Sequence, residues 1–152
     1  MLVLKMFLFA TLISFITAKL EINVEGKHPW ASDLPTWRRK DRITSIYLGD
    51  QPLTGYHIWL VLLILTFIHS PYIFNLGWTP SRELQTLAAF CFGVLVEDFF
   101  WFLLNPFFGL KKLNRVDAPW HNSWLGLIPG MYWKLSIVIV SFLIISFMLP
   151  QL

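Results

Sequence analysis

Four long apolar stretches constrain the fold of this 152-residue chain more than any other feature of its sequence. Each is close to the roughly 20 apolar residues that a helix needs to cross the hydrocarbon core of a bilayer. Helices satisfy their own backbone hydrogen bonds, which lipid cannot do, so helix is the expected state. The sequence therefore predicts an all-α integral membrane protein. We expect a bundle of four transmembrane helices, a single polytopic domain over residues 1–152, with spans at about 1–18, 56–74, 84–104 and 132–149.

The composition agrees with a surface that faces lipid. Only 14% of the residues are charged and 56% are apolar, whereas a soluble domain carries roughly a quarter charged residues. The densest basic run, residues 38–42, is more typical of a solvated loop beside anionic lipid than of a nucleic-acid site. We therefore expect the lipid bilayer as the main partner, no nucleic acid, and another membrane protein as a second candidate partner.

The distribution of basic residues indicates the orientation of the helices. The loop of residues 19–55 holds six Lys and Arg residues and the loop of residues 105–131 holds three, but the loop between them holds only Arg82. Lys and Arg concentrate in cytoplasmic loops, so both basic loops are expected in the cytoplasm and both termini outside. The expected location is the plasma membrane, crossed several times.

The first apolar stretch has a second interpretation. Lys5, followed by an apolar run and Ile16-Thr17-Ala18, is also typical of a signal peptide with its cleavage site. Cleavage would place both basic loops outside, against the charge pattern. The charge pattern therefore favours an uncleaved first helix.

Turn-forming residues mark the ends of the helices and the character of the loops. Thr79 and Pro80 suit the N-cap and first turn of a helix. Pro71 is expected to kink or end the second helix, and Asn105, before a proline, to end the third. Both basic loops combine Trp with Gly and Pro, which predicts two ordered aromatic-rich cytoplasmic loops; disorder in the first loop is the alternative. Interfacial positions are expected for Trp78 on the outside and for Trp59, Trp101 and Trp133 on the inside.

Glu97 and Asp98 are the most informative residues, because they lie inside the third apolar stretch. A carboxylate at this depth costs several kcal/mol unless it is paired, protonated or wetted. Their distance from Asn105 places both in the cytoplasmic third of the membrane, about 100° apart on the helix. Asp98, Trp101 and Asn105 share one helix face, so Trp101 and Asn105 are candidate ligand-binding residues. Glu97 and Asp98 are the candidate catalytic residues, as a base, a proton carrier or a ligand.

Two histidines are expected on the same side of the membrane as these acids. His57 begins the second span, and His121 lies in the second basic loop. Imidazole and carboxylate groups bind zinc, iron or manganese, so His57, His121, Glu97 and Asp98 form a candidate metal site for a divalent transition metal. The spacing supports this only weakly, because no HxxxH or HExxH motif is present. For each histidine, a hydrogen-bonding role at the interface is the commoner alternative.

Several function classes are excluded and three stay open. The chain has one cysteine, Cys91, so it cannot carry a CxxC redox pair, and it has no GxSxG, P-loop or GxGxxG motif. The first hypothesis is a binding or catalytic site for a metal, a proton or a lipid headgroup at the cytoplasmic membrane face. The second is a noncatalytic membrane partner or assembly factor whose intramembrane acids are a structural lock. The third is a transporter or channel subunit that requires oligomerisation; the pair Ala89 and Gly93 could serve that or packing within the bundle.

Overall fold

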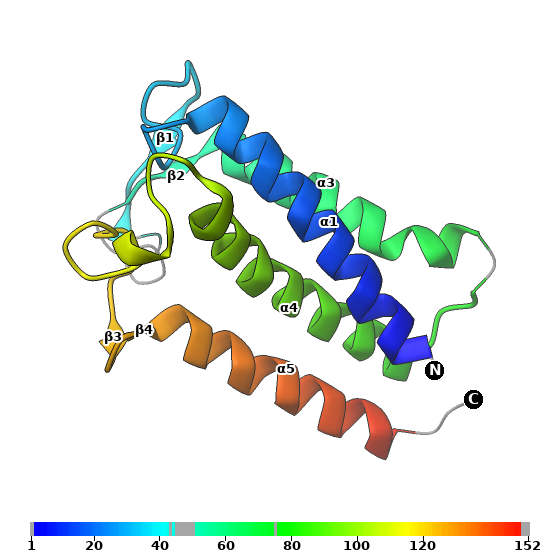
Figure 1. Cartoon of the computed structure of the whole chain (residues 1–152). Helices are drawn as coiled ribbons and strands as arrows, with labels where there is room; N and C mark the ends of the chain where they lie inside the picture. The colour runs from blue at the N-terminus through cyan, green and yellow to red at the C-terminus, as the bar shows by residue number, and fades with distance from the viewer. Residues whose placement is uncertain (1, 43, 45–50, 75, 150–152) are drawn as a thin grey trace.

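Figure 1 shows a computed structural model of the chain, which describes residues 2–42, 44, 51–74 and 76–149. Met1 and Asn75, which belong to the expected first span and to the loop before the third, lie outside the described residues. The long helices of the described part are α1 (Leu2–Glu25), α3 (Gly55–Ile73), α4 (Pro80–Leu104) and α5 (Gly130–Met148). The short elements are the 3-10 helix η1 (Leu110–Lys112) and the antiparallel pairs β1 (Arg38–Arg39) with β2 (Leu53–Thr54) and β3 (Trp124–Leu125) with β4 (Ile128–Pro129).

The short elements gather at one end of the helix bundle, and the two termini lie toward the other end (Figure 1). We call the former the loop end; it consists of the described parts of residues 26–54 and 105–129. The short turn between α3 and α4 lies at the opposite end. This arrangement confirms the expected bundle of antiparallel helices and brings the two basic loops to the same end.

Helix α1 is longer than the apolar stretch from which it was predicted. The apolar stretch ends at Ala18, but the helix continues to Glu25 and stops at Gly26, which has φ +60°. A positive φ is disfavoured for residues with a Cβ, so glycine suits this helix end. Glu21 and Glu25 therefore belong to the last two turns of α1 and are buried in the bundle, not in a loop.

The predicted caps of α4 are confirmed. Thr79 is the N-cap and accepts a hydrogen bond from the backbone N–H of Arg82, Pro80 occupies the first turn, and Asn105 is the C-cap. Pro71 ends α3 less abruptly than expected, since the helix continues to Ile73. These caps fix the register of α4, and hence the positions of its acids relative to the loop end.

Small residues bring α1 and α4 close together. The Ser14 hydroxyl donates a hydrogen bond to the backbone oxygen of Gly93 over 2.7 Å. A Cβ on Gly93 would lie 3.2 Å from Ser14 Oγ, so this approach requires a residue with almost no side chain. Ala89 is fully buried and packs with Ala10 of α1. The small-residue pair of α4 therefore serves packing within the bundle.

Helix α5 packs on another face of α4 (Figure 1). Near the terminal end, the Ser81 hydroxyl donates to the backbone oxygen of Ser146 over 2.8 Å. Near the loop end, the Tyr132 hydroxyl donates to Asp98 Oδ2 over 2.7 Å. Polar contacts thus join the two helices at both ends, and α4 lies between α1 and α5.

An aromatic cluster closes the bundle at the loop end. Phe102 is fully buried, stacks on Trp120 of the second loop at 5.8 Å between ring centroids, and packs with Trp101 and Phe108. Trp101, expected near the inner interface, is only 5% exposed, because α1 extends far enough to cover it with Ala18 and Ile22. Exposed indole rings occur at the other expected positions, Trp59, Trp78 and Trp133.

The outward faces of the helices are apolar. Exposed side chains include Leu8 and Leu12 of α1, Leu63 and Phe67 of α3, and Ile137 of α5. Within the described residues, four helices are long and apolar enough to cross a membrane. Large exposed apolar surfaces on such helices are what contact with lipid requires.

Candidate functional site

A cavity of about 330 Å³ lies between α1, α3 and α4. This volume falls within the range of small-molecule sites, which are mostly apolar with a few polar groups. Most of the wall is aliphatic or aromatic, formed by Ile13, Ile58, Val61, Ile64, Ile68 and Phe90. The cavity therefore runs along the apolar part of the helices and is not a surface cleft of a loop.

The end of the cavity nearest the loops is acidic. Glu21 and Glu25 reach it from α1, and Glu97 and Asp98 reach it from α4. One turn of helix separates Glu21 from Glu25, so both point to the same side of α1. Four carboxyl groups from two helices thus line one end of a mostly apolar space.

Glu97 faces α1. Its carboxyl group lies against the carboxyl group of Glu21, within hydrogen-bonding reach. A carboxylate can only accept, so a hydrogen bond between the two requires that one of them carries a proton. Glu97 Oε1 is buried and has no hydrogen-bond donor within the described part of the chain. Trp101 Nε1 and His121 Nε2 are two further buried polar atoms without a hydrogen-bond partner among the described residues.

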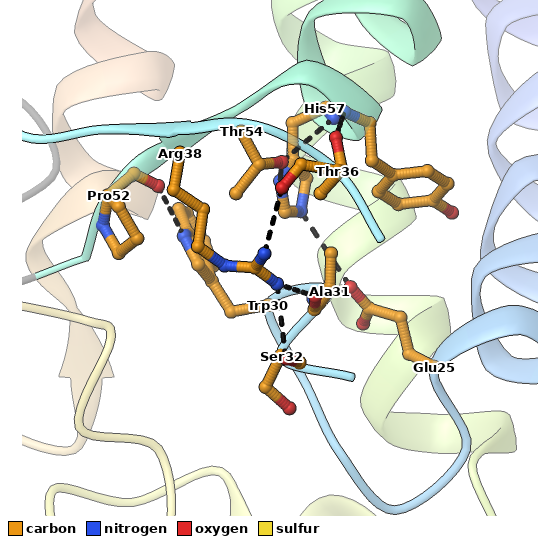
Figure 2. A network of polar contacts seen from close by, with 10 residues as sticks. Glu25, Trp30, Ala31, Ser32, Thr36, Arg38, Pro52, Thr54 and His57 are labelled. Atoms are coloured by element: carbon orange, nitrogen blue, oxygen red, sulfur yellow. Dashed lines mark hydrogen bonds and ion pairs between the residues drawn. The ribbon is translucent and has the colours of Figure 1, made fainter. Parts of the chain in front are cut away.

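Glu25 connects the end of α1 to the first loop. Its Oε1 accepts a hydrogen bond from the backbone N–H of Ala31 over 2.6 Å. His57 Nε2 lies 3.8 Å from the same oxygen, and His57 Nδ1 lies 2.6 Å from Thr54 Oγ1 (Figure 2). Thr54 is also the N-cap of α3, because its hydroxyl oxygen accepts from the backbone N–H of His57. The start of α3 therefore holds the imidazole in a fixed orientation beside Glu25.

A tight turn of the first loop covers this part of the site. Trp30 and Ala31 both have positive φ, 62° and 52°, a conformation that residues with a Cβ rarely adopt. The Arg38 guanidinium holds the turn by donating to the backbone oxygens of Ala31 and Ser32 (Figure 2). The Trp30 indole N–H donates to Pro52 O over 2.8 Å, and its ring packs on His57 in a tilted arrangement with 4.7 Å between ring centroids. The turn thus places an aromatic ring over the acidic end.

Asp98 lines the same cavity as Glu97, but its polar contacts are with α5 and the second loop. It accepts the 2.7 Å hydrogen bond from Tyr132, and His121 Nε2 lies 3.4 Å from the same oxygen. His121 is buried, and its ring packs among Phe102 and Trp124. The hydrogen bond from Tyr132 and the neighbouring imidazole give Asp98 the surroundings of a structural acid, in contrast to Glu97.

The structure brings some of the predicted site residues together and separates others. Glu97, Asp98, His57 and Trp101 line the same cavity. His121 touches Asp98 from behind the cavity wall, and Asn105 uses its side chain to bond Gly26 O and the backbone N–H of Phe107. The two remaining histidines lie elsewhere: His28 pairs with Asp33 at 3.5 Å in the exposed loop, and His69 with Glu83 at 3.1 Å near the terminal end.

The predicted metal site receives no support from this geometry. No group of three or more His, Cys, Asp and Glu side chains among the described residues is arranged to hold a metal ion. The physical reason is that each histidine has a different carboxylate neighbour. His57 lies beside Glu25 and His121 beside Asp98, on different sides of α4, so the two imidazoles do not converge on one point. A divalent metal as cofactor therefore stays a prediction from the sequence.

Glu21 and Glu25 were missed as site residues, although the sequence contains a signal for them. The buried side of α1 includes Ala10, Ser14, Ala18 and Ile22, at helical spacing. Thr17, Glu21 and Glu25 continue a parallel row at intervals of one turn, past the last apolar residue of the span. This row predicts a helix to Gly26 and places both acids on its inner face.

Fold and site together define a class: a small multi-pass membrane protein whose helix bundle contains a mostly apolar cavity with carboxyl groups at one end. No family model, curated protein or solved structure matches the chain. Its function must therefore be inferred from the site itself.

Proposed function

We propose that this protein binds a lipid-like amphiphilic molecule, with the apolar part between α1, α3 and α4 and the polar part at the acidic end. The observation that supports this most is the composition of the cavity, which is aliphatic along its length and acidic at one end only. A purely polar ligand would leave the apolar wall unfilled, and a purely apolar one would leave Glu97 Oε1 without a donor. An amphiphile satisfies both parts.

The depth of the acids supports the same proposal. Asp98 lies about two turns before the end of α4, so a headgroup at the acidic end would lie close to one surface of the bilayer. The basic loops favour the cytoplasmic surface, and the plasma membrane remains the expected membrane. A molecule entering from that leaflet would need to move its headgroup only a short distance.

Blocking the apolar part of the cavity tests this proposal. Ile64 lines the cavity on α3, and Ile64→Trp would fill part of it. Ile137, on the lipid-facing side of α5, is 66% exposed, so Ile137→Trp is the matched control. Native mass spectrometry of the purified proteins should show an amphiphile bound to the wild type and to Ile137→Trp, and reduced by about ten-fold in Ile64→Trp. Equal binding by all three proteins would contradict the proposal.

A second candidate function is that of a noncatalytic assembly partner whose acids act as a structural lock. The contacts of Asp98 with Tyr132 and of Glu25 with Ala31 favour it, because they join α4 to α5 and α1 to the first loop. On this account, Glu97→Gln would lower the folded yield as much as Asp98→Ala does. Comparison of the two yields by size-exclusion chromatography separates the two functions.

A further inference from the structure

We propose that the polar part of this amphiphile is a protonated amine, so that the ligand is a long-chain organic cation. This inference rests on the proposed function, since it names the headgroup of the same ligand. It follows from the charge, the hydrogen-bonding groups and the aromatic rings of the acidic end.

The charge of the cavity lining selects a cation. The described residues that line it include four carboxyl groups and one histidine, but no lysine or arginine. A phosphate or carboxylate headgroup would meet like charge there, with only His57 to oppose it. Two basic residues of the first loop have partners within that loop: Arg38 donates to backbone oxygens, and Arg39 pairs with Asp41.

The hydrogen-bonding groups select an amine over a neutral alcohol. The acidic end offers acceptors, and the buried Glu97 Oε1 has no donor within the described residues. An ammonium group has three donors and no acceptor, whereas a hydroxyl has only one donor. An ammonium between Glu21 and Glu97 would also replace the contact between their two carboxyl groups with charge-assisted hydrogen bonds.

The aromatic rings support the same headgroup. Trp30, Trp101 and Trp120 line the cavity together with the acids. Indole faces attract cations, and the attraction grows when the cation is removed from water. The buried Trp101 indole N–H lies beside the Glu25 carboxyl, so this ring borders the place of the proposed headgroup. The described residues form no three-ligand metal site, which favours an organic cation over a metal ion.

Photolabelling with three probes of equal chain length tests this inference. The protein is placed in phosphatidylcholine nanodiscs with diazirine-bearing hexadecylamine, hexadecanol or palmitate at equal concentration. Labelled peptides from α1, α3 and α4 are then quantified by mass spectrometry. We expect the amine to label them about ten-fold more than the alcohol, since hydrogen bonds to charged groups exceed neutral ones by about that factor in affinity. Palmitate should label them least.

Variants without carboxylates at the acidic end test whether charge causes the preference for the amine over the alcohol. The double variant Glu21→Gln, Glu97→Gln should reduce amine labelling to the level of the alcohol, while alcohol labelling persists and shows that the cavity is intact. Glu83→Gln, at the opposite end of α4, is the control and should keep the amine preference. Equal labelling of the wild type by amine and alcohol, or an amine preference that survives the double variant, would overturn this inference but leave the proposed function standing. Absence of all three probes from the cavity peptides would overturn both.

Discussion

Glu97 and Asp98 are neighbours in sequence but have opposite surroundings. Asp98 accepts a hydrogen bond from Tyr132 and lies beside His121, whereas Glu97 has a buried oxygen without a donor and a second carboxyl group against it. A buried polar group without partners destabilises a fold, so its presence indicates a role such as catalysis or the binding of a water, an ion or a ligand. The two residues therefore predict different results when they are changed.

Glu97→Gln should leave the protein folded and raise its stability. The new amide can donate to Glu21, which replaces a contact between two carboxyl groups with a hydrogen bond. We expect a gain of about 1–3 kcal/mol, the usual cost of an unsatisfied buried group. Thermal unfolding of the ligand-free protein in detergent measures this gain. A lower unfolding temperature than that of the wild type would show that Glu97 is part of a structural lock.

Tyr132→Phe should lower the stability, because it removes the donor that joins α5 to Asp98. Hydrogen bonds to charged groups contribute about 1.5–3 kcal/mol, so a loss of that order is expected. Asp98→Asn should be milder, since its amide oxygen still accepts from Tyr132. Unfolding of both variants by the same thermal assay checks the order; a larger loss for Asp98→Asn would argue against this role of the hydroxyl group.

At the scale of single elements, the contact between α1 and α4 determines whether the acidic end exists. Glu21 and Glu25 reach the cavity only because Gly93 allows α1 to approach closely. Gly93→Leu should force the helices apart, lower the stability by about 1–3 kcal/mol and weaken amphiphile binding. Gly93→Ala should be tolerated better, since its Cβ would approach the Ser14 hydroxyl to 3.2 Å and would meet Ala10 at ordinary contact distances of 3.7 and 3.9 Å.

The binding measurement for Gly93→Leu uses native mass spectrometry, as for the Ile64 variant. Leu63→Ala, on the exposed face of α3, is a suitable control because its side chain is 48% exposed. If Gly93→Leu bound the amphiphile as the wild type does, the cavity would not depend on the approach of α1 to α4.

The elements show what could be predicted from the sequence. Local chemistry was sufficient for the caps Thr79 and Asn105, because both act within one turn of the chain. The end of α1 was misplaced because hydropathy reports contact with lipid, while the last turns of α1 face the bundle and tolerate acids there. The angle of about 100° between successive helix residues correctly placed Glu97 and Asp98 on different faces of α4. It could not reveal that α1 packs beside Glu97 and α5 beside Asp98.

At the scale of the whole molecule, the arrangement of the bundle predicts the topology. The loop end carries most of the basic residues and should face the cytoplasm. In a Cys91→Ser background, a membrane-impermeant maleimide should label Trp78→Cys in intact cells, and Lys112→Cys only after permeabilisation; both positions are exposed. Labelling of Lys112→Cys in intact cells would place the acidic end at the outer surface.

The central claim is that a long molecule occupies the space between α1, α3 and α4, with one end against Glu97. An experimental structure of the protein, crystallised from a lipidic mesophase without added ligand, tests it most directly. The account predicts continuous elongated electron density along Ile64 and Ile68 that ends within hydrogen-bonding distance of the Glu97 carboxyl. A collapsed cavity, or one holding only isolated water peaks, would contradict it.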